Sequence, residues 1–101
     1  MERTQASELE IRQEEQGGVG SFFVERDGRR LAELRYSRSS PGTVVIEHTE
    51  VSSVLQGQGV GRRLVESAVE WARRTGTKFV LVCAYARSVF ERSPGLRDVL
   101  Q

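Results

Sequence analysis

Polar and hydrophobic residues alternate with a period of two along much of the first half of the chain. Over Arg30 to Ser37, Leu31, Glu33 and Arg35 alternate with Ala32, Leu34 and Tyr36, which is typical of a half-buried strand. Thr43 to Val51 has the same period. Gly20 to Arg26 is rich in β-formers, and Leu9 to Gln13 alternates weakly. The pattern therefore predicts four strands before residue 52.

Turn signals separate these four segments. Gln16-Gly17-Gly18 predicts a turn, Asp27-Gly28 is a hairpin signal, and the serine-rich stretch Ser37 to Gly42 predicts a loop. Short connections favour antiparallel pairing of consecutive strands. The first half of the chain is therefore expected to form an antiparallel meander.

The period changes to that of a helix after residue 58. Apolar residues on one helical face predict a helix from Gly59 to about Thr75, and Gly76 is expected to end it. Phe79 to Cys83 predicts a short strand buried on both faces. A second helix is expected over Ala84 to Arg92, followed by a break at Ser93-Pro94-Gly95 and a last turn over 96–100. The fold class is mixed α+β, with a right-handed parallel β-α-β unit after the meander.

Composition narrows the class of protein. The 101 residues suffice for one domain over 1–101, of which the polar residues 1–8 are expected to be flexible. The net charge of +1, with both signs interspersed, gives no reason to expect nucleic acid as a partner. Cys83 is the single cysteine, so no internal disulfide forms. No apolar run reaches the ~20 residues of a membrane span. A cytoplasmic protein, monomeric or weakly dimeric and without a metal, is expected.

A glycine-rich stretch joins the fourth strand to the first helix. Gln56-Gly57-Gln58-Gly59-Val60-Gly61 leaves its backbone N–H groups uncovered by side chains, and the helix N-terminus adds roughly half a positive charge. Such a turn can bind a phosphate or diphosphate. The alternative is that the glycines serve only a tight turn. The spacing matches neither a P-loop nor the dinucleotide fingerprint GxGxxG.

The same six residues resemble the Q/R-x-x-G-x-G/A signature of the GNAT (GCN5-related) N-acetyltransferase superfamily. The resemblance extends over 43–96 and is strongest to a very small, roughly hundred-residue group, through Glu47-His48-Thr49-Glu50-Val51, Cys83 and Pro94. It implies a minimal GNAT fold that lacks the usual helices between the first two strands. It also implies an acetyl-coenzyme A site whose contacts are Val51, Gln56, Gly57, Gln58, Gly59, Val60, Gly61, Arg62 and Cys83.

Candidate catalytic residues follow from the chemistry of amide formation, which needs a base for the amine and an acid for the leaving thiolate. His48 and Glu50, two apart on one strand, are expected on the same face as Val44 and Ile46. Each is a candidate base. The alternatives are a structural histidine and a solvated or arginine-paired carboxylate.

Residues of the second helix region give further candidates. By resemblance, Cys83 occupies the position of an asparagine, and Phe90 that of a tyrosine which serves as the acid in many relatives. A phenylalanine has no proton to give. Cys83 is a candidate contact or thiolate, with inert burial as the alternative, and Tyr85 is the other candidate acid.

The resemblance implies an N-acetyltransferase that moves an acetyl group from acetyl-coenzyme A to a primary amine by direct attack. The acceptor is a small molecule or a protein lysine. A second hypothesis is a non-catalytic module that binds acyl-coenzyme A, which the phenylalanine at position 90 favours. A third is an unrelated α+β interaction domain in which the glycines only make a turn.

Overall fold

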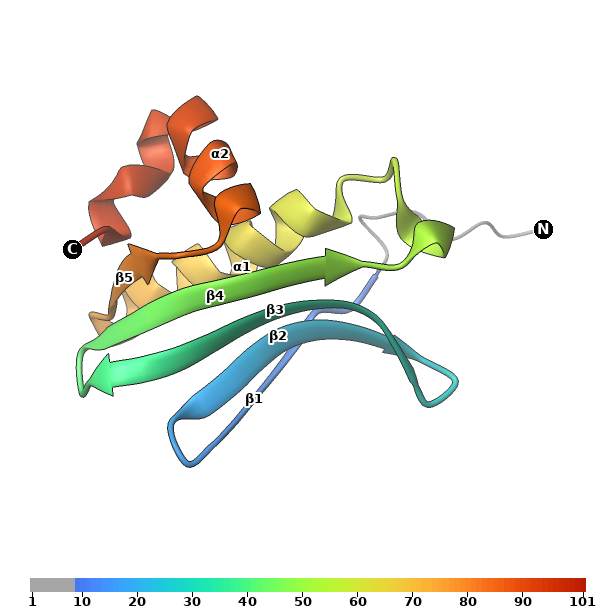
Figure 1. Cartoon of the computed structure of the whole chain (residues 1–101), viewed down its shortest axis with the longest axis horizontal. Coiled ribbons are helices and arrows are strands. Elements are labelled where there is room, and N and C mark those ends of the chain that lie inside the picture. The colour runs from blue at the N-terminus through green and yellow to red at the C-terminus, as the bar shows by residue number, and fades with distance from the viewer. Residues whose placement is uncertain (1–8) are drawn as a thin grey trace.

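The computed structural model describes residues 9–101, so the expectation for residues 1–8 lies outside it. Five strands form one sheet in the order β1-β2-β3-β4-β5, with helices packed on one face (Figure 1). The strands are β1 Arg12–Gln16, β2 Val19–Arg26, β3 Arg29–Ser40, β4 Thr43–Val51 and β5 Lys78–Leu81. The α-helices are α1 Val60–Thr75 and α2 Ala84–Arg92, and the 3₁₀ helices are η2 Ser53–Leu55 and η3 Pro94–Val99.

The predicted antiparallel meander is confirmed for β1 to β4. Positive φ angles at Gly17, Gly18, Asp27 and Gly28 make the two tight turns. Two of these strands differ in their bounds from the expectation. The first strand lies three residues later than expected, next to its turn, and β3 continues through the predicted serine-rich loop to Ser40. Cross-strand pairing with β4 and with the β1–β2 turn holds this part of β3 extended despite its loop-like composition.

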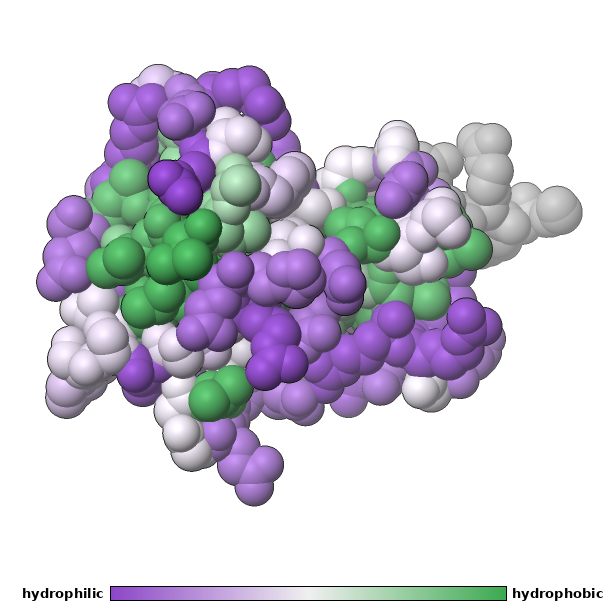
Figure 2. Space-filling view, viewed as in Figure 1, coloured by the Kyte–Doolittle hydropathy of each residue, from purple (hydrophilic) through white to green (hydrophobic). Residues whose placement is uncertain are grey.

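The β-α-β unit is also confirmed, because β4 and β5 pair in parallel around α1. Gly59 and Gly76 flank α1 in the left-handed conformation. The expectation that β5 is buried on both faces was wrong, since Val80 is exposed, as is Val82 just after the strand. Both α-helices cover the same face of the sheet, which leaves the other face of this edge strand open. Figure 2 shows the resulting apolar area on the open face at the β5 end.

The core lies between the covered face and the helices. An aromatic cluster of Phe22, Tyr36 and Trp71 anchors α1 on β2 and β3, with ring centroids 5.3–5.7 Å apart. The Tyr36 side chain is fully buried, and its hydroxyl accepts a hydrogen bond from Gln13 and donates one to Glu15. Burial raises the pKa of Tyr36 to about 12, so this hydroxyl remains a donor at neutral pH.

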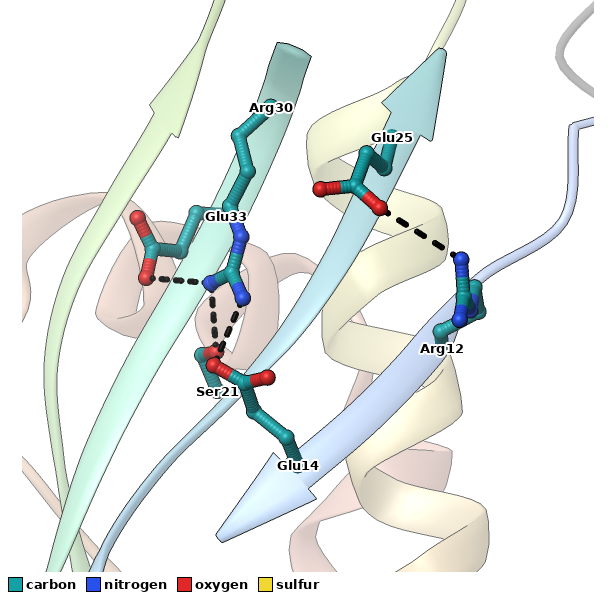
Figure 3. Close-up of polar contacts among 6 residues, drawn as sticks. All are labelled: Arg12, Glu14, Ser21, Glu25, Arg30 and Glu33. Carbon is teal, nitrogen blue, oxygen red and sulfur yellow. Dashed lines mark hydrogen bonds and ion pairs between the residues drawn. The ribbon is translucent and has the colours of Figure 1, made fainter. Parts of the chain in front are cut away.

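The open face is held by a polar network centred on Arg30 (Figure 3). Its guanidinium donates to Glu14 at 2.6 Å, to Glu33 at 3.1 Å and to Ser21 at 3.0 Å. It also stacks 3.8 Å from the centroid of Phe23, which it shields from water. The network links β1, β2 and β3, and with Arg30 over its ring Phe23 is buried. No helix among the described residues is long and apolar enough to cross a membrane.

The approach of Tyr36 to Gly20 predicts a sharp difference between two glycine substitutions. A Cβ at Gly20 would lie 2.5 Å from the Tyr36 ring and 2.7 Å from the Glu14 carbonyl oxygen, whereas a Cβ at Gly42 meets nothing within 4 Å. Gly20→Ala should therefore lower the free energy of unfolding by about 1–3 kcal/mol. Gly42→Ala should change it by less than about 0.5 kcal/mol. Chemical denaturation measures both, and equal effects would contradict this packing.

Candidate active site

β5 pairs with only the first half of β4. Their parallel register covers Thr43 to Ile46 of β4, but β4 continues for five more residues to Val51. The Ile46 carbonyl oxygen accepts hydrogen bonds from the N–H groups of both Val82 and Cys83, each at 3.0 Å, and the chain then turns into α2. The edge of β4 beyond Ile46 thus has no strand beside it on the β5 side.

A β-bulge at Glu47 lies at the same point. Arg35 pairs with His48 and the adjacent Tyr36 with Ile46, so Glu47 is an extra residue in β4. The alternation of faces therefore changes by one residue. The expectation that His48 and Glu50 share a face with Val44 and Ile46 was wrong, because His48 and Glu50 lie on the open face.

The residues that replace them on the covered face are Thr49 and Val51. Thr49 pairs with the buried Leu34, and Val51 pairs with the buried Ala32. These two β4 side chains border the space that opens between β4 and α2. Sequence reasoning missed Thr49 because a bulge leaves no clear signal in the alternation of polar and apolar residues.

A pocket of about 330 Å³ occupies this space. It extends from the free part of β4 to the start of α1, with one side chain from α2. The lining residues are Thr49, Val51, Leu55, Gln56, Gly57, Gly59, Val60, Gly61 and Tyr85. Val51 and most of the glycine loop, which were expected to contact the donor, line this pocket, whereas Gln58 and Cys83, also expected as donor contacts, do not.

The glycine loop presents open backbone to this pocket. Gly57 and Gly59 have φ angles of +82° and +73°, and a Cβ on either would meet nothing within 4 Å. Gly59 caps α1 without a side-chain hydrogen bond, and the first turn of α1 contains no acidic residue. The first N–H groups of α1 thus keep their capacity to bind an anion. The loop backbone therefore offers N–H groups of the kind that bind a phosphate or diphosphate.

Arg62, expected as a further phosphate contact, lies beside this loop. Its Nε donates to Glu66 at 2.9 Å, one helical turn further along α1. This exposed ion pair on the helix surface is of the kind that contributes only a few tenths of a kcal/mol, so an incoming anion can compete for the guanidinium.

Cys83 caps the N-terminus of α2. Its sulfur accepts a hydrogen bond from the Ala86 N–H at 3.5 Å and lies 3.3 Å from the Thr49 hydroxyl oxygen. The residue is 7% exposed and stands behind the wall of the pocket, where β4 and β5 diverge. Phe90 is 2% exposed and packs edge-on against Phe79, so it belongs to the core.

A second pocket, of about 320 Å³, adjoins the first and shares Val51 with it. Its lining residues are Arg30, Leu31, Ala32, Glu33, Glu50, Val51 and Ser52. Glu33 and Glu50 are direct cross-strand partners. The Glu50 side chain is 75% exposed, and its Oε2 lies 3.6 Å from His48 Nε2. Glu50 therefore lines the second pocket together with Glu33 and Arg30, and His48 contacts Glu50 without lining the pocket itself.

Comparison with known proteins agrees with this geometry. The family model described as GCN5-related N-acetyltransferase matches residues 21–99. A candidate GCN5-like N-acetyltransferase from Staphylococcus aureus has a similar structure, with 33% identity, a TM-score of 0.70 and coverage of 92% of this chain and 88% of that one. No curated protein sequence matches the chain.

More distant structures share the fold. Aminoglycoside N-acetyltransferase AAC(6')-Iy, solved in complex with coenzyme A, has 15% identity, a TM-score of 0.58 and coverage of 82% of this chain and 88% of that one. The ribosomal-protein-alanine N-acetyltransferase from Brucella melitensis has 16% identity and a TM-score of 0.61, with coverage of 77% and 62%. The chain belongs to the GCN5-related N-acetyltransferase family.

The capping role of Cys83 predicts how two substitutions differ. Cys83→Ser keeps an acceptor for the Ala86 N–H, whereas Cys83→Ala loses the cap and leaves a small void behind Thr49. The alanine variant should lose about 1 kcal/mol or more of unfolding free energy, and the serine variant less than half as much. Thermal denaturation of the two variants measures this, and an equal loss would mean that the sulfur does not cap α2.

Proposed function

We propose that this protein transfers an acetyl group from acetyl-coenzyme A to a primary amine. The observation that carries the proposal is the pocket where β4 leaves β5, with the glycine loop and the start of α1 at one end. A pocket with a free strand edge and free helix N–H groups suits a long ligand that carries a diphosphate. Residues 9–101 would act as one acetyl-coenzyme A-binding unit.

Each part of the proposed donor has a partner in this pocket. The loop amides from Gln56 to Gly61 would hold the diphosphate, and Arg62 would add a charge-assisted contact. The free edge of β4 at Val51 would pair with the amide groups of the pantetheine arm, as an extra strand would. The thioester would then lie toward the point of divergence, near Thr49 and Cys83. Family membership and the coenzyme A complex of a relative support this assignment.

The second pocket is the proposed acceptor site. It adjoins the donor pocket at Val51, and Glu33 and Glu50 face each other across β3 and β4. Arg30 already pairs with Glu33 at 3.1 Å, so Glu50 is the carboxylate of this pocket that would attract a protonated amine. Glu50 would accept the proton of the ammonium group, because only the neutral amine attacks a thioester. His48 would assist through its contact with Glu50.

An assay with a wide panel of amines would identify the acceptor. Relatives with this fold include proteins described as acetylating aminoglycosides and a ribosomal-protein alanine, so both small polyamines and peptide amines belong in the panel. β1 and β2 join through a two-residue turn with no helix between them, which leaves the open face free for a large acceptor.

The second hypothesis is a non-catalytic module that binds acyl-coenzyme A, and Phe90 favours it because this buried side chain donates no proton. A thiol-release assay with acetyl-coenzyme A and the amine panel separates the two. Amine-dependent release of coenzyme A supports the transferase. Tight binding without release for any amine supports the module.

Substitution at Gly59 tests the donor site. Gly59→Asp places a carboxylate at the proposed diphosphate site, and aspartate tolerates the left-handed conformation better than most residues. This variant should fold and should show no binding of coenzyme A in calorimetry. Gly59→Asn, of the same size but uncharged, should retain weak binding, and Gly42→Asp at the far turn should bind as the unaltered protein does. Unchanged affinity in Gly59→Asp would refute the donor site.

Three substitutions test the proposed catalytic groups. Glu50→Gln should lower the maximal rate at least tenfold, equivalent to about 1.4 kcal/mol of transition-state stabilisation. His48→Asn should lower it less, because His48 lines neither pocket and contacts Glu50 alone of the proposed groups. Cys83→Ser, which keeps the α2 cap, should lower turnover more than its small change in stability explains. Equal and small losses in all three would mean that an ordered water or an already neutral amine replaces the base.

A further inference from the structure

The side chain of Tyr85 forms the α2 wall of the donor pocket. It is the only α2 residue among the lining residues, and 39% of it remains exposed. A Cβ added at Gly61 would lie 2.8 Å from the Tyr85 hydroxyl oxygen and 2.9–3.0 Å from two of its ring carbons. The ring therefore lies directly on the first turn of α1, with its hydroxyl beside the Gly61 backbone.

This contact explains why position 61 is glycine in this chain. Gly61 is buried and its φ angle is not positive, so the backbone itself would accept alanine, which also favours helix. Gly57 and Gly59 differ, because each has a positive φ and open space around it. Tyr85 thus sets the residue at position 61 by its ring, whereas backbone conformation sets the other two.

The position of the hydroxyl indicates its role. The N–H groups of Val60, Gly61 and Arg62 have no partner within the helix, since the first backbone hydrogen bond of α1 runs from Arg63 to Gly59. A phenolic hydroxyl beside these groups is placed to donate a hydrogen bond to an anion that they would bind. Cys83 lies beside Thr49, at the proposed thioester end of the pocket. The Tyr85 hydroxyl lies at the other end, beside Gly61.

We propose that Tyr85 is a positioning residue for the donor, with its hydroxyl donating a hydrogen bond to the diphosphate of coenzyme A over Gly61. This inference rests on the proposed function. It departs from the sequence-based hypothesis that Tyr85 is the acid for the leaving thiolate. A hydroxyl that holds the diphosphate affects affinity for the donor, whereas an acid affects the rate of transfer.

Calorimetric titration of coenzyme A into Tyr85→Phe tests the hydroxyl. A lost hydrogen bond to a charged group should raise the dissociation constant roughly tenfold. Pantetheine, which lacks the diphosphate, should bind the variant and the unaltered protein equally in an NMR titration. Equal weakening of both ligands, or unchanged affinity for coenzyme A with a lowered maximal rate, would overturn the proposal. If the unaltered protein binds no coenzyme A, the proposed function itself fails.

A double-mutant cycle tests the packing of the ring on Gly61. Gly61→Ala alone should weaken coenzyme A binding at least fivefold, because the new Cβ displaces the ring. In the Tyr85→Ala background the same Gly61→Ala change should alter affinity less than twofold and should raise the melting temperature. An equal loss of affinity in both backgrounds would show that Gly61 acts independently of Tyr85 and would overturn the inference.

Discussion

The Ile46 carbonyl group is the point on which the proposed site depends. Its oxygen accepts hydrogen bonds from the N–H groups of both Val82 and Cys83. The pairing of β5 with β4 ends there, and the chain turns into α2. Everything that borders the donor pocket follows from that divergence: the free edge of β4, the wall formed by α2 and the opening toward the glycine loop. A β5 that paired with the whole of β4 would fill the pocket with backbone.

The Glu47 bulge changes which side chains of β4 lie on each face of the sheet. Before the bulge, Val44 and Ile46 contribute to the core. After it, Thr49 and Val51 border the donor pocket, whereas His48 and Glu50 face the open side of the sheet beside Glu33. One extra residue therefore places Thr49 and Val51 beside the pocket and the ionisable side chains of His48 and Glu50 on the opposite face. Val51 touches both pockets and marks where the two proposed substrates would meet.

The sequence predicted the architecture well because its signals are local. Alternation in β3, the Asp27-Gly28 turn, the apolar stripe of α1 and the stop at Gly76 each appear within a few residues of chain. The sequence-based prediction was wrong where the outcome depends on elements that are distant in the chain. Val80 is apolar yet exposed, because both α-helices lie on the other face, and no local signal reports that choice.

For the candidate site too, some features were predictable from the sequence and others were not. The glycine loop and Val51 were predictable from motif and order of elements. The faces of His48 and Glu50 were not, since a bulge changes them without altering composition. The contact of Tyr85 with Gly61 joins residues 24 positions apart through the packing of two helices, which single-sequence patterns do not encode.

In the proposed complex, the β4 edge beyond Ile46 and the glycine loop together bind coenzyme A. Amide hydrogen exchange with and without coenzyme A measures this residue by residue. Slower exchange should appear in β4 between Glu47 and Val51 and from Gly57 to Arg62, with little change in β1 and β2. Exchange that stays unchanged in both stretches at saturating coenzyme A would contradict the account.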